Sequence, residues 1–243
     1  MTIDESAIGY GSRARIGVIL PSGNRAAEPQ FARMTPAGVT LHVTRLSLTG
    51  TSEEALLGMT RDVESAAGLL ADTDPALILF HCTAVSTYNL TLERSIIQRI
   101  AGASGKPASA TSQAITSALN ALQAKRVVML SPYPDGIHAK ETAFLQANGF
   151  DVIRSANVPC ASVTEMMAIT PDQWHAHTQE NRVADADAYL LSCTAVRTAE
   201  VVQSLETVLE RPVITSNTSA MWHCLRTVGI SDGVDGFGHL FSL

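Results

Sequence analysis

Two cysteines occupy matching places in two short stretches of the chain. The first stretch is LILFHCTAVS, residues 77–86, which contains Cys82, and the second is YLLSCTAVRT, residues 189–198, which contains Cys193. In each stretch an apolar run leads to the cysteine, and Thr-Ala-Val follows it. A thiolate is a nucleophile and a thiol is an acid, so a pair of them can attack a small molecule and move a proton on it. We expect both cysteines to be catalytic.

The chain repeats itself around these cysteines. Cys193 follows Cys82 by 111 positions, and Pro132 in RVVMLSP follows Pro21 in RIGVILP by the same interval. Further along, GKPASATS (105–112) aligns with ERPVITSN (210–217) at a slightly shorter interval. We therefore expect two similar halves related by a pseudo-two-fold axis.

Short aliphatic runs alternate with longer amphipathic segments. Strands are predicted at 15–20, 40–46, 76–81, 126–131, 150–155 and 188–193, with shorter ones in KPASA and RPVITS. Helices are predicted at 53–71, 87–102, 111–123, 136–148, 171–184, 197–209 and 217–228. Repeated strand-helix units predict an α/β fold with parallel sheets covered on both faces. We expect an N-terminal lobe at 1–120 and a C-terminal lobe at 121–243, with 212–243 able to cross over to the first lobe.

The predicted sheets position the cysteines. Ligands of an open parallel sheet bind beyond the carboxyl ends of its strands, where Cys82 and Cys193 lie. Each cysteine also precedes a predicted helix, whose N-terminal N–H groups and dipole favour a thiolate. If the lobes face each other, the two sulfurs flank one cleft. A lone cysteine at a strand end is more often a small buried hydrophobe, which is the role expected for Cys160 and Cys224.

Two further polar residues, His81 and Asn217, lie near predicted strand ends. His81 precedes Cys82, and because neighbouring strand side chains point to opposite faces, we expect it to pack in the interior. Asn217 either caps the last helix or reaches the cleft.

Composition narrows the class of partner. Hydrophobic residues make up 46% of the 243 residues and charged residues 16%, and the formal net charge is −6. Without a local Lys/Arg cluster, this balance argues against nucleic acid and anionic membranes as partners.

The N-terminal stretch is expected to be a polar leader, and no apolar run reaches the roughly 20 residues of a membrane span. We expect a cytoplasmic homo-oligomer that binds a small molecule and has no metal site, since the histidines lack metal-ligand spacing.

The motifs of the two halves resemble those of the aspartate/glutamate racemase superfamily. The resemblance is carried by HCTAVS and SCTAVRT together with IGVILPSGN and SPYPDGIH, and it spans residues 15 to about 240. It is closest to the branch of the maleate cis-trans isomerases and the arylmalonate decarboxylases. The resemblance implies two Rossmann-like lobes with the active site between them, and no cofactor or metal.

Within that branch, the residues of this chain are more similar to the isomerases. Arylmalonate decarboxylases have glycine where Cys82 stands, and P-S-x-N at 21–24 looks like an isomerase motif. The resemblance implies a cis-trans isomerase of a small dicarboxylic acid, with Cys82 as nucleophile and Cys193 as acid and base. It also implies that the substrate is held by Asn24, Tyr133 and the backbone near Thr83 and Thr194.

Other functions stay open. The stretch NVPCASVTEMMAITP looks more like the decarboxylase branch, and its apolar EMMA suggests room for a substituted acid. A racemase or an arylmalonate-type decarboxylase would use Cys193 to protonate a planar intermediate. A catalytically silent protein that binds a small acid in the same cleft is a third possibility.

Overall fold

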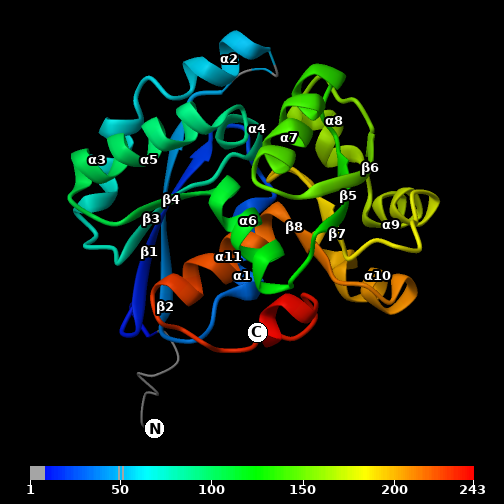
Figure 1. The fold of residues 1–243 in the computed structure, drawn as a ribbon. Helices are drawn as coiled ribbons and strands as arrows, with labels where there is room; N and C mark the ends of the chain where they lie inside the picture. The colour runs from blue at the N-terminus through cyan, green and yellow to red at the C-terminus, as the bar shows by residue number, and fades with distance from the viewer. Residues whose placement is uncertain (1–8, 49, 51) are drawn as a thin grey trace, which may run out of the picture.

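Two four-stranded parallel sheets form the framework of the molecule (Figure 1). The computed structural model describes residues 9–48, 50 and 52–243, so the expected polar leader lies, through residue 8, outside the described residues. In the first sheet the order is β2 (Val39–Leu46), β1 (Ala14–Pro21), β3 (Leu77–Phe80), β4 (Ala108–Ala110). In the second it is β6 (Asp151–Asn157), β5 (Arg126–Ser131), β7 (Ala188–Leu191), β8 (Val213–Thr215). The α/β fold with two similar parallel sheets is confirmed.

The inner strands are continuous apolar runs because helices cover both faces of each sheet. All four residues of β3 and of β7 are buried, whereas the edge strand β6 is partly exposed along its length. The pairing partners match as well, since β1 pairs with both β2 and β3, and β5 pairs with both β6 and β7. The two halves therefore present equivalent strand ends to each other.

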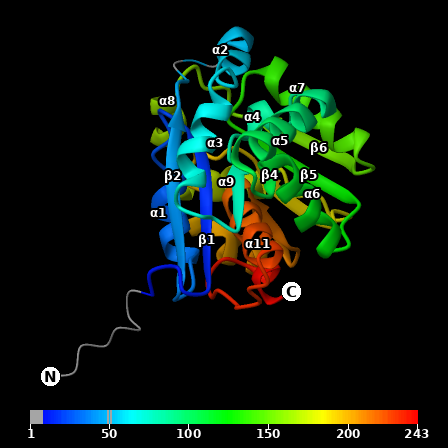
Figure 2. The same cartoon turned by 90° about the vertical axis from the view of Figure 1, so that its left-hand side faces the viewer.

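Helices connect the strands in both halves (Figures 1 and 2). In the first half they are α1 (Ala27–Met34), α2 (Glu53–Gly58), α3 (Val63–Ala71), α4 (Thr83–Ser86), α5 (Leu90–Ser104) and α6 (Thr111–Ala121). In the second half they are α7 (Asp135–Ala147), α8 (Val163–Ala168), α9 (Pro171–Glu180), α10 (Val202–Leu209) and α11 (Ser216–Thr227), with 3-10 turns at Ala199–Val201 and His239–Ser242. Within the described residues, every helix is too short or too polar to traverse a lipid bilayer.

Several local features differ from the sequence predictions. Helices α1, α4 and α8 lie outside the predicted helix ranges, and the segment 53–71 forms two helices rather than one. A helix at 197–209 was predicted, but the chain turns at 194–198 and becomes α-helical only at Val202. Cys193 therefore lacks the helix that was expected to begin just after it.

Helices α6 and α11 pack against each other at the centre of the molecule, between the two sheets (Figure 1). Each follows the last strand of its own sheet, so the pair lies where a pseudo-two-fold axis requires equivalent elements to meet. Helix α11 also contacts α1 and shares a core with strand residues of the first sheet. The lobe limits 1–120 and 121–243, and the crossover of 212–243 to the first lobe, stay a prediction.

Candidate active site

Cys82 and Cys193 line a single cavity between the carboxyl ends of the two sheets. Cys82 lies two residues beyond β3 and Cys193 two residues beyond β7. The cavity holds about 50 Å³ and both thiols are buried. Ligand pockets for small molecules usually reach several hundred Å³. The structure brings the two cysteines together, in a space that must widen before an acid can enter.

Cys82 lies at the start of the short helix α4. Its backbone is extended, with φ −148°, and the N–H groups of Val85 and Ala84 face the sulfur and favour its ionised form. Burial has the larger effect and raises the pKa of Cys82 to about 12. In the closed cavity Cys82 is therefore a neutral thiol and not the expected thiolate, because the loss of hydration outweighs the effect of the helix N-terminus.

Cys193 has a different local geometry. Its φ is +106°, a region that residues other than glycine rarely adopt and that costs conformational energy. Burial raises the pKa of Cys193 to about 12, against the opposing effect of hydrogen bonds from the Tyr133 hydroxyl and from the Ala195 N–H at 3.3 Å. In place of a helix N-terminus, a strained turn and a tyrosine surround this second thiol.

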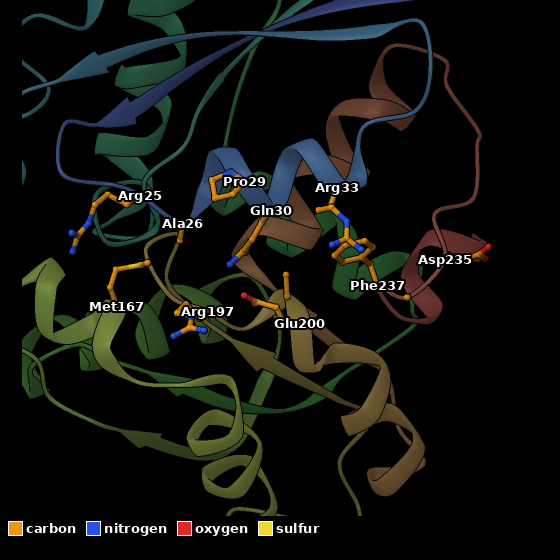
Figure 3. Close-up of a pocket in the computed structure, with 12 residues that line it drawn as sticks. Arg25, Ala26, Pro29, Gln30, Arg33, Met167, Arg197, Glu200, Asp235 and Phe237 are labelled. Carbon is orange, nitrogen blue, oxygen red and sulfur yellow. The ribbon is translucent and has the colours of Figure 1, made fainter. Parts of the chain in front are cut away.

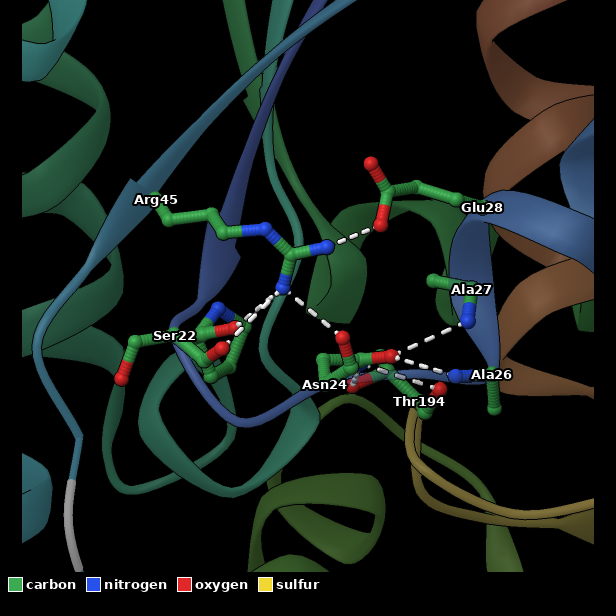
Figure 4. Close-up of polar contacts among 8 residues, drawn as sticks. Ser22, Asn24, Ala26, Ala27, Glu28, Arg45 and Thr194 are labelled. Atoms are coloured by element: carbon green, nitrogen blue, oxygen red, sulfur yellow. Dashed lines mark hydrogen bonds and ion pairs between the residues drawn. The ribbon is translucent and has the colours of Figure 1, made fainter.

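Asn24 joins the two halves beside the cavity (Figure 4). Its Nδ2 donates to the carbonyl oxygen of Thr194 at 3.1 Å and to its Oγ1 at 3.0 Å. Its Oδ1 accepts from the N–H groups of Ala26 and Ala27, at the beginning of α1. Both ends of the amide are engaged, so Asn24 can hold a carboxylate only by giving up a bond to Thr194.

Arg45 supports the turn that carries Asn24 (Figure 4). From strand β2, its Nη1 donates to the carbonyl oxygens of Ser22 at 3.2 Å and Asn24 at 2.8 Å. Its Nη2 forms an ion pair with Glu28 on α1. The guanidinium thus fixes the backbone of the loop after β1 without entering the cavity.

The remaining predicted binding residues lie in two different settings. Tyr133 and Thr194 line the cavity with the cysteines. Thr83 does not; its hydroxyl donates to Ser216 Oγ at 2.9 Å, and Ser216 Oγ also accepts from the backbone N–H of Cys193 at 3.0 Å. Ser216, which sequence reasoning missed, thereby links the two cysteine loops. A signal was present, since the polar run TSNTS follows the last strand.

A buried polar network lies behind the cavity. His81 Nε2 is 2.8 Å from Asn217 Oδ1, and Asn217 Nδ2 donates to Gln30 at 2.5 Å and to the Thr194 carbonyl at 3.3 Å. Burial lowers the pKa of His81 to about 4, so the imidazole is neutral near pH 7. His81 packs in the interior as predicted. Asn217 does not cap α11, because Thr215 does.

Apolar side chains make the rest of the cavity wall. They are Leu48, Leu56, Ile137, Val163 and Met166. Met166, on α8, is buried, and its Sδ lies 3.9 Å from Cys193 Sγ. Within the described part of the chain, no charged side chain lines this cavity. An acid bound here would be held by neutral donors against an apolar wall.

Two other cysteines were expected to pack in the interior, and both are buried. Cys224 belongs to the core around α11. Cys160 lies nearer the site than Cys224 does. A negative charge on Cys160 would raise the pKa of Cys193. Among the residues that the structure describes, no group of three or more His, Cys, Asp or Glu side chains could hold a metal ion.

A larger hollow of about 520 Å³ is lined by residues of α1, of the segment 197–200 and of the segment 235–237 (Figure 3). Arg25, Arg33 and Arg197 line it, and none of the predicted site residues does. It contains no cysteine or other nucleophile of the site. The small cavity between the cysteines is therefore the candidate active site.

The chain is similar in sequence to known proteins along nearly its whole length. A family model described as arylmalonate decarboxylase matches residues 16–241. The chain is 27% identical to a maleate isomerase of Nocardia farcinica, over 93% of this chain and 94% of that protein. It is 24% identical to an arylmalonate decarboxylase of Bordetella bronchiseptica, over 95% and 97%.

Solved structures are similar as well. A mutant maleate isomerase from Pseudomonas putida S16, solved with maleate, has a TM-score of 0.90 at 20% identity and covers 94% of this chain and 97% of that one. A mutant Nocardia farcinica maleate cis-trans isomerase with a covalently bound succinylcysteine intermediate has a TM-score of 0.88 at 25% identity, with 94% and 98% covered.

Proposed function

Because the chain belongs to the arylmalonate decarboxylase family, we propose that it is a cofactor-independent cis-trans isomerase of a small dicarboxylic acid. The observation that carries this proposal is the position of Cys82 and Cys193, which line one cavity from equivalent strand ends. The similar Nocardia farcinica enzyme has been solved with a succinylcysteine, the adduct expected when a thiol adds to such an alkene.

The first half of the proposed reaction joins the acid to Cys82. The ionised sulfur forms a bond to one alkene carbon, and the electron pair of the double bond moves onto the adjacent carbon and its carboxylate as an enediolate. Cys193 then donates its proton to that adjacent carbon. The result is a thioether in which the former double bond is single and can rotate.

The second half reverses these steps after rotation. The Cys193 thiolate removes the proton it had donated, the double bond forms again in the trans arrangement, and the Cys82 sulfur leaves as a thiolate. Each cysteine ends in its starting state, so no other reactant is consumed.

Neutral donors would hold the two carboxylates. We assign this role to Asn24, Tyr133 and the N–H groups near Thr83 and Thr194. The N–H groups of Ala84 and Val85 already face the Cys82 sulfur, and that of Ala195 faces Cys193. Removing one donor that stabilises an enediolate would lower the rate about 10²-fold or more.

Ionisation of Cys82 must accompany substrate entry. Burial keeps its pKa at about 12 while the cavity is closed. When the apolar wall opens to admit the acid, water enters as well, so the desolvation that opposes the thiolate decreases. The thiol proton passes to that water, and the N–H groups of Ala84 and Val85 stabilise the charge that forms.

An arylmalonate-type decarboxylase or a racemase is the second candidate. The apolar wall, with Val163 and Met166 on α8, favours it because such a wall suits a bulky substituent. In that reaction Cys193 alone protonates a planar intermediate, and Cys82 is dispensable.

Proton NMR in D₂O separates the candidates. The wild-type protein is incubated with maleate, an arylmalonate and an amino acid, and isomerisation, loss of carbon dioxide and solvent exchange are followed in the same samples. Cys82→Ala is expected to abolish isomerisation of maleate, and Cys224→Ala, a buried cysteine of the other core, serves as the control. Retained turnover in Cys82→Ala, or turnover of the arylmalonate alone, would favour the second candidate.

The cellular setting also belongs to this proposal. We expect the enzyme to act in the cytoplasm as a homo-oligomer. Two large side chains on helices support an interface, since Leu69 on α3 is 63% exposed and Val208 on α10 is 41% exposed. Light scattering coupled to size exclusion measures the mass, and a monomer across the micromolar range would contradict the expectation.

A further inference from the structure

Glu141 is a fully buried carboxyl group beside the candidate active site. It lies on α7 with no exposed surface, and its Oε1 accepts a hydrogen bond of 2.5 Å from Ser192 Oγ. Ser192 is also fully buried, and it is the residue immediately before Cys193. One hydrogen bond therefore connects this carboxyl group to the loop that carries the second thiol.

The other oxygen of Glu141 lacks a partner. Oε2 is buried without a hydrogen bond among the described residues, and no lysine, arginine or histidine of that part of the chain forms an ion pair with this carboxyl group. A charged carboxylate is costly in such a place, because neither water nor a cation compensates it. The neutral acid, which carries no charge that must be compensated, is the favoured form.

Titratable groups lie near Glu141 in the neighbouring loops and on its own helix. Tyr133 in the loop after β5 and Cys193 in the loop after β7 interact with its charge, and His138 lies three residues before it on α7. His138 is engaged with Ser131 Oγ at 2.8 Å. A negative charge on Glu141 raises the pKa of both Tyr133 and Cys193, so these two groups respond to its ionisation.

The sequence repeat shows that Glu141 has no carboxyl counterpart at the equivalent position of the first half. The interval of 111 positions places Glu141 opposite Gln30 on α1, and Ser192 opposite His81. In the first half Gln30 and His81 are joined through Asn217, with neutral groups throughout. At this pair of equivalent positions the ionisable carboxyl group therefore belongs to the half of Cys193, the thiol to which we assign the proton transfers.

We propose that Glu141 is a positioning residue that acts through Ser192 and controls the protonation state of Cys193. Ionised Glu141 raises the pKa of the Cys193 thiol, and uncharged Glu141 leaves that pKa lower. Burial places the switch near neutrality, since it raises the pKa of Glu141 to about 7 against the opposing effect of the Ser192 hydrogen bond. The role in turnover rests on the proposed isomerase function, whereas the coupling between the two groups does not.

Infrared spectroscopy of the substrate-free protein tests the coupling directly. A protonated buried carboxyl group has a C=O stretching band separate from the carboxylate bands, and we expect it to vanish as pH rises through about 7. In Glu141→Gln the band should be absent at every pH. In Ser192→Ala it should persist to higher pH, because the hydrogen bond that favours the carboxylate is gone. Absence of a titrating band from wild type and Ser192→Ala between pH 5 and 9 would overturn the proposal, whether or not Glu141→Gln folds.

Thiol alkylation at pH 9 measures the consequence at Cys193. With mass spectrometry of each cysteine, Cys193 should react faster in Glu141→Gln than in wild type, by up to about tenfold for a change of one pKa unit. Cys224, buried in the other core, is the internal reference for a general loosening of the structure. An unchanged ratio of Cys193 to Cys224 reactivity would contradict the coupling.

Activity supplies the final readout. In the pH profile of kcat/KM, the inflection near pH 7 should disappear in Glu141→Gln and move to higher pH in Ser192→Ala. A residue with a purely structural role would lower kcat/KM at every pH and leave the inflection in place. If the spectroscopic titration is present and no isomerase activity is found, the proposed function fails and the coupling stands.

Discussion

Asn24 and Thr194 form a direct link between the two halves of the molecule. The Asn24 amide donates to both the carbonyl and the hydroxyl oxygen of Thr194, at 3.1 and 3.0 Å, across the edge of the cavity. The same side chain accepts from the first N–H groups of α1. One buried amide therefore fixes the beginning of α1 and the loop of the second cysteine relative to each other, beside the proposed carboxylate site.

Asn24→Ala should consequently lose both stability and activity. Removing a buried side chain with four hydrogen bonds is expected to lower the free energy of unfolding by about 1–3 kcal/mol, measured by urea denaturation. The matched control is Asn89→Ala, which removes an N-cap of α5 from outside the cavity. The control should lose about 1 kcal/mol and keep its activity. Equal activity in both variants would argue against a binding role for Asn24.

The closed cavity predicts slow reaction of Cys82 with alkylating agents. Because burial raises its pKa to about 12 while a free thiol has about 8.5, the thiolate fraction at pH 7 is about 3,000-fold lower. Iodoacetamide labelling followed by mass spectrometry should show Cys82 reacting at least that much more slowly than the same cysteine in urea. Labelling of the native protein at the rate of a free thiol would show that Cys82 is activated without substrate.

Backbone strain at Cys193 should reverse the usual order of alanine and glycine. At φ +106° glycine is under less strain than alanine, so Cys193→Gly should unfold at a higher urea concentration than Cys193→Ala. We expect its free energy of unfolding to be higher by about 1 kcal/mol. Cys82, with φ −148°, provides the matched pair, in which Cys82→Ala should be the more stable. The same order at both positions would mean that the strain at Cys193 carries no energetic cost.

Met166 should set the size of the acid that the site accepts. Met166→Ala removes a side chain that covers Cys193, so kcat/KM for a substituted acid should rise relative to that for maleate. Met167→Ala is the control, because Met167 lines the outer hollow with Arg25 and Arg197 and not the cavity of the cysteines. Steady-state kinetics with both acids measures the ratio, and the same ratio in both variants would exclude Met166 from substrate selection.

His81 should make the protein sensitive to acid. Its folded pKa of about 4 lies below the ordinary value of 6.5, so the unfolded chain binds a proton first as pH falls. The free energy of unfolding should therefore decrease between pH 6.5 and 4, by about 3 kcal/mol at 1.36 kcal/mol per pKa unit. In His81→Gln this part of the pH dependence should be missing. Identical slopes for the two proteins over that range would contradict the prediction.

Much of the fold follows from the sequence because strand and helix patterns are local. Apolar runs such as 77–80 and 188–191 are strands wherever helices cover them, and the repeat at 111 positions indicates two equivalent sheets. Parallel strands end at the same edge, so the sequence alone predicts the two cysteines at one cleft. Helices α1 and α8 were missed because short helices depend on packing more than on pattern.

The chemistry of the site depended on contacts that no local pattern contains. The sequence by itself determined the α/β class, the pseudo-two-fold repeat and the presence of Cys82 and Cys193 at matching strand ends. Only the tertiary structure decided that both thiols are neutral, that Asn24 is bound to Thr194, and that Glu141 is buried behind Cys193. Desolvation and hydrogen bonding are set by atoms that are distant in sequence and meet only when the chain folds.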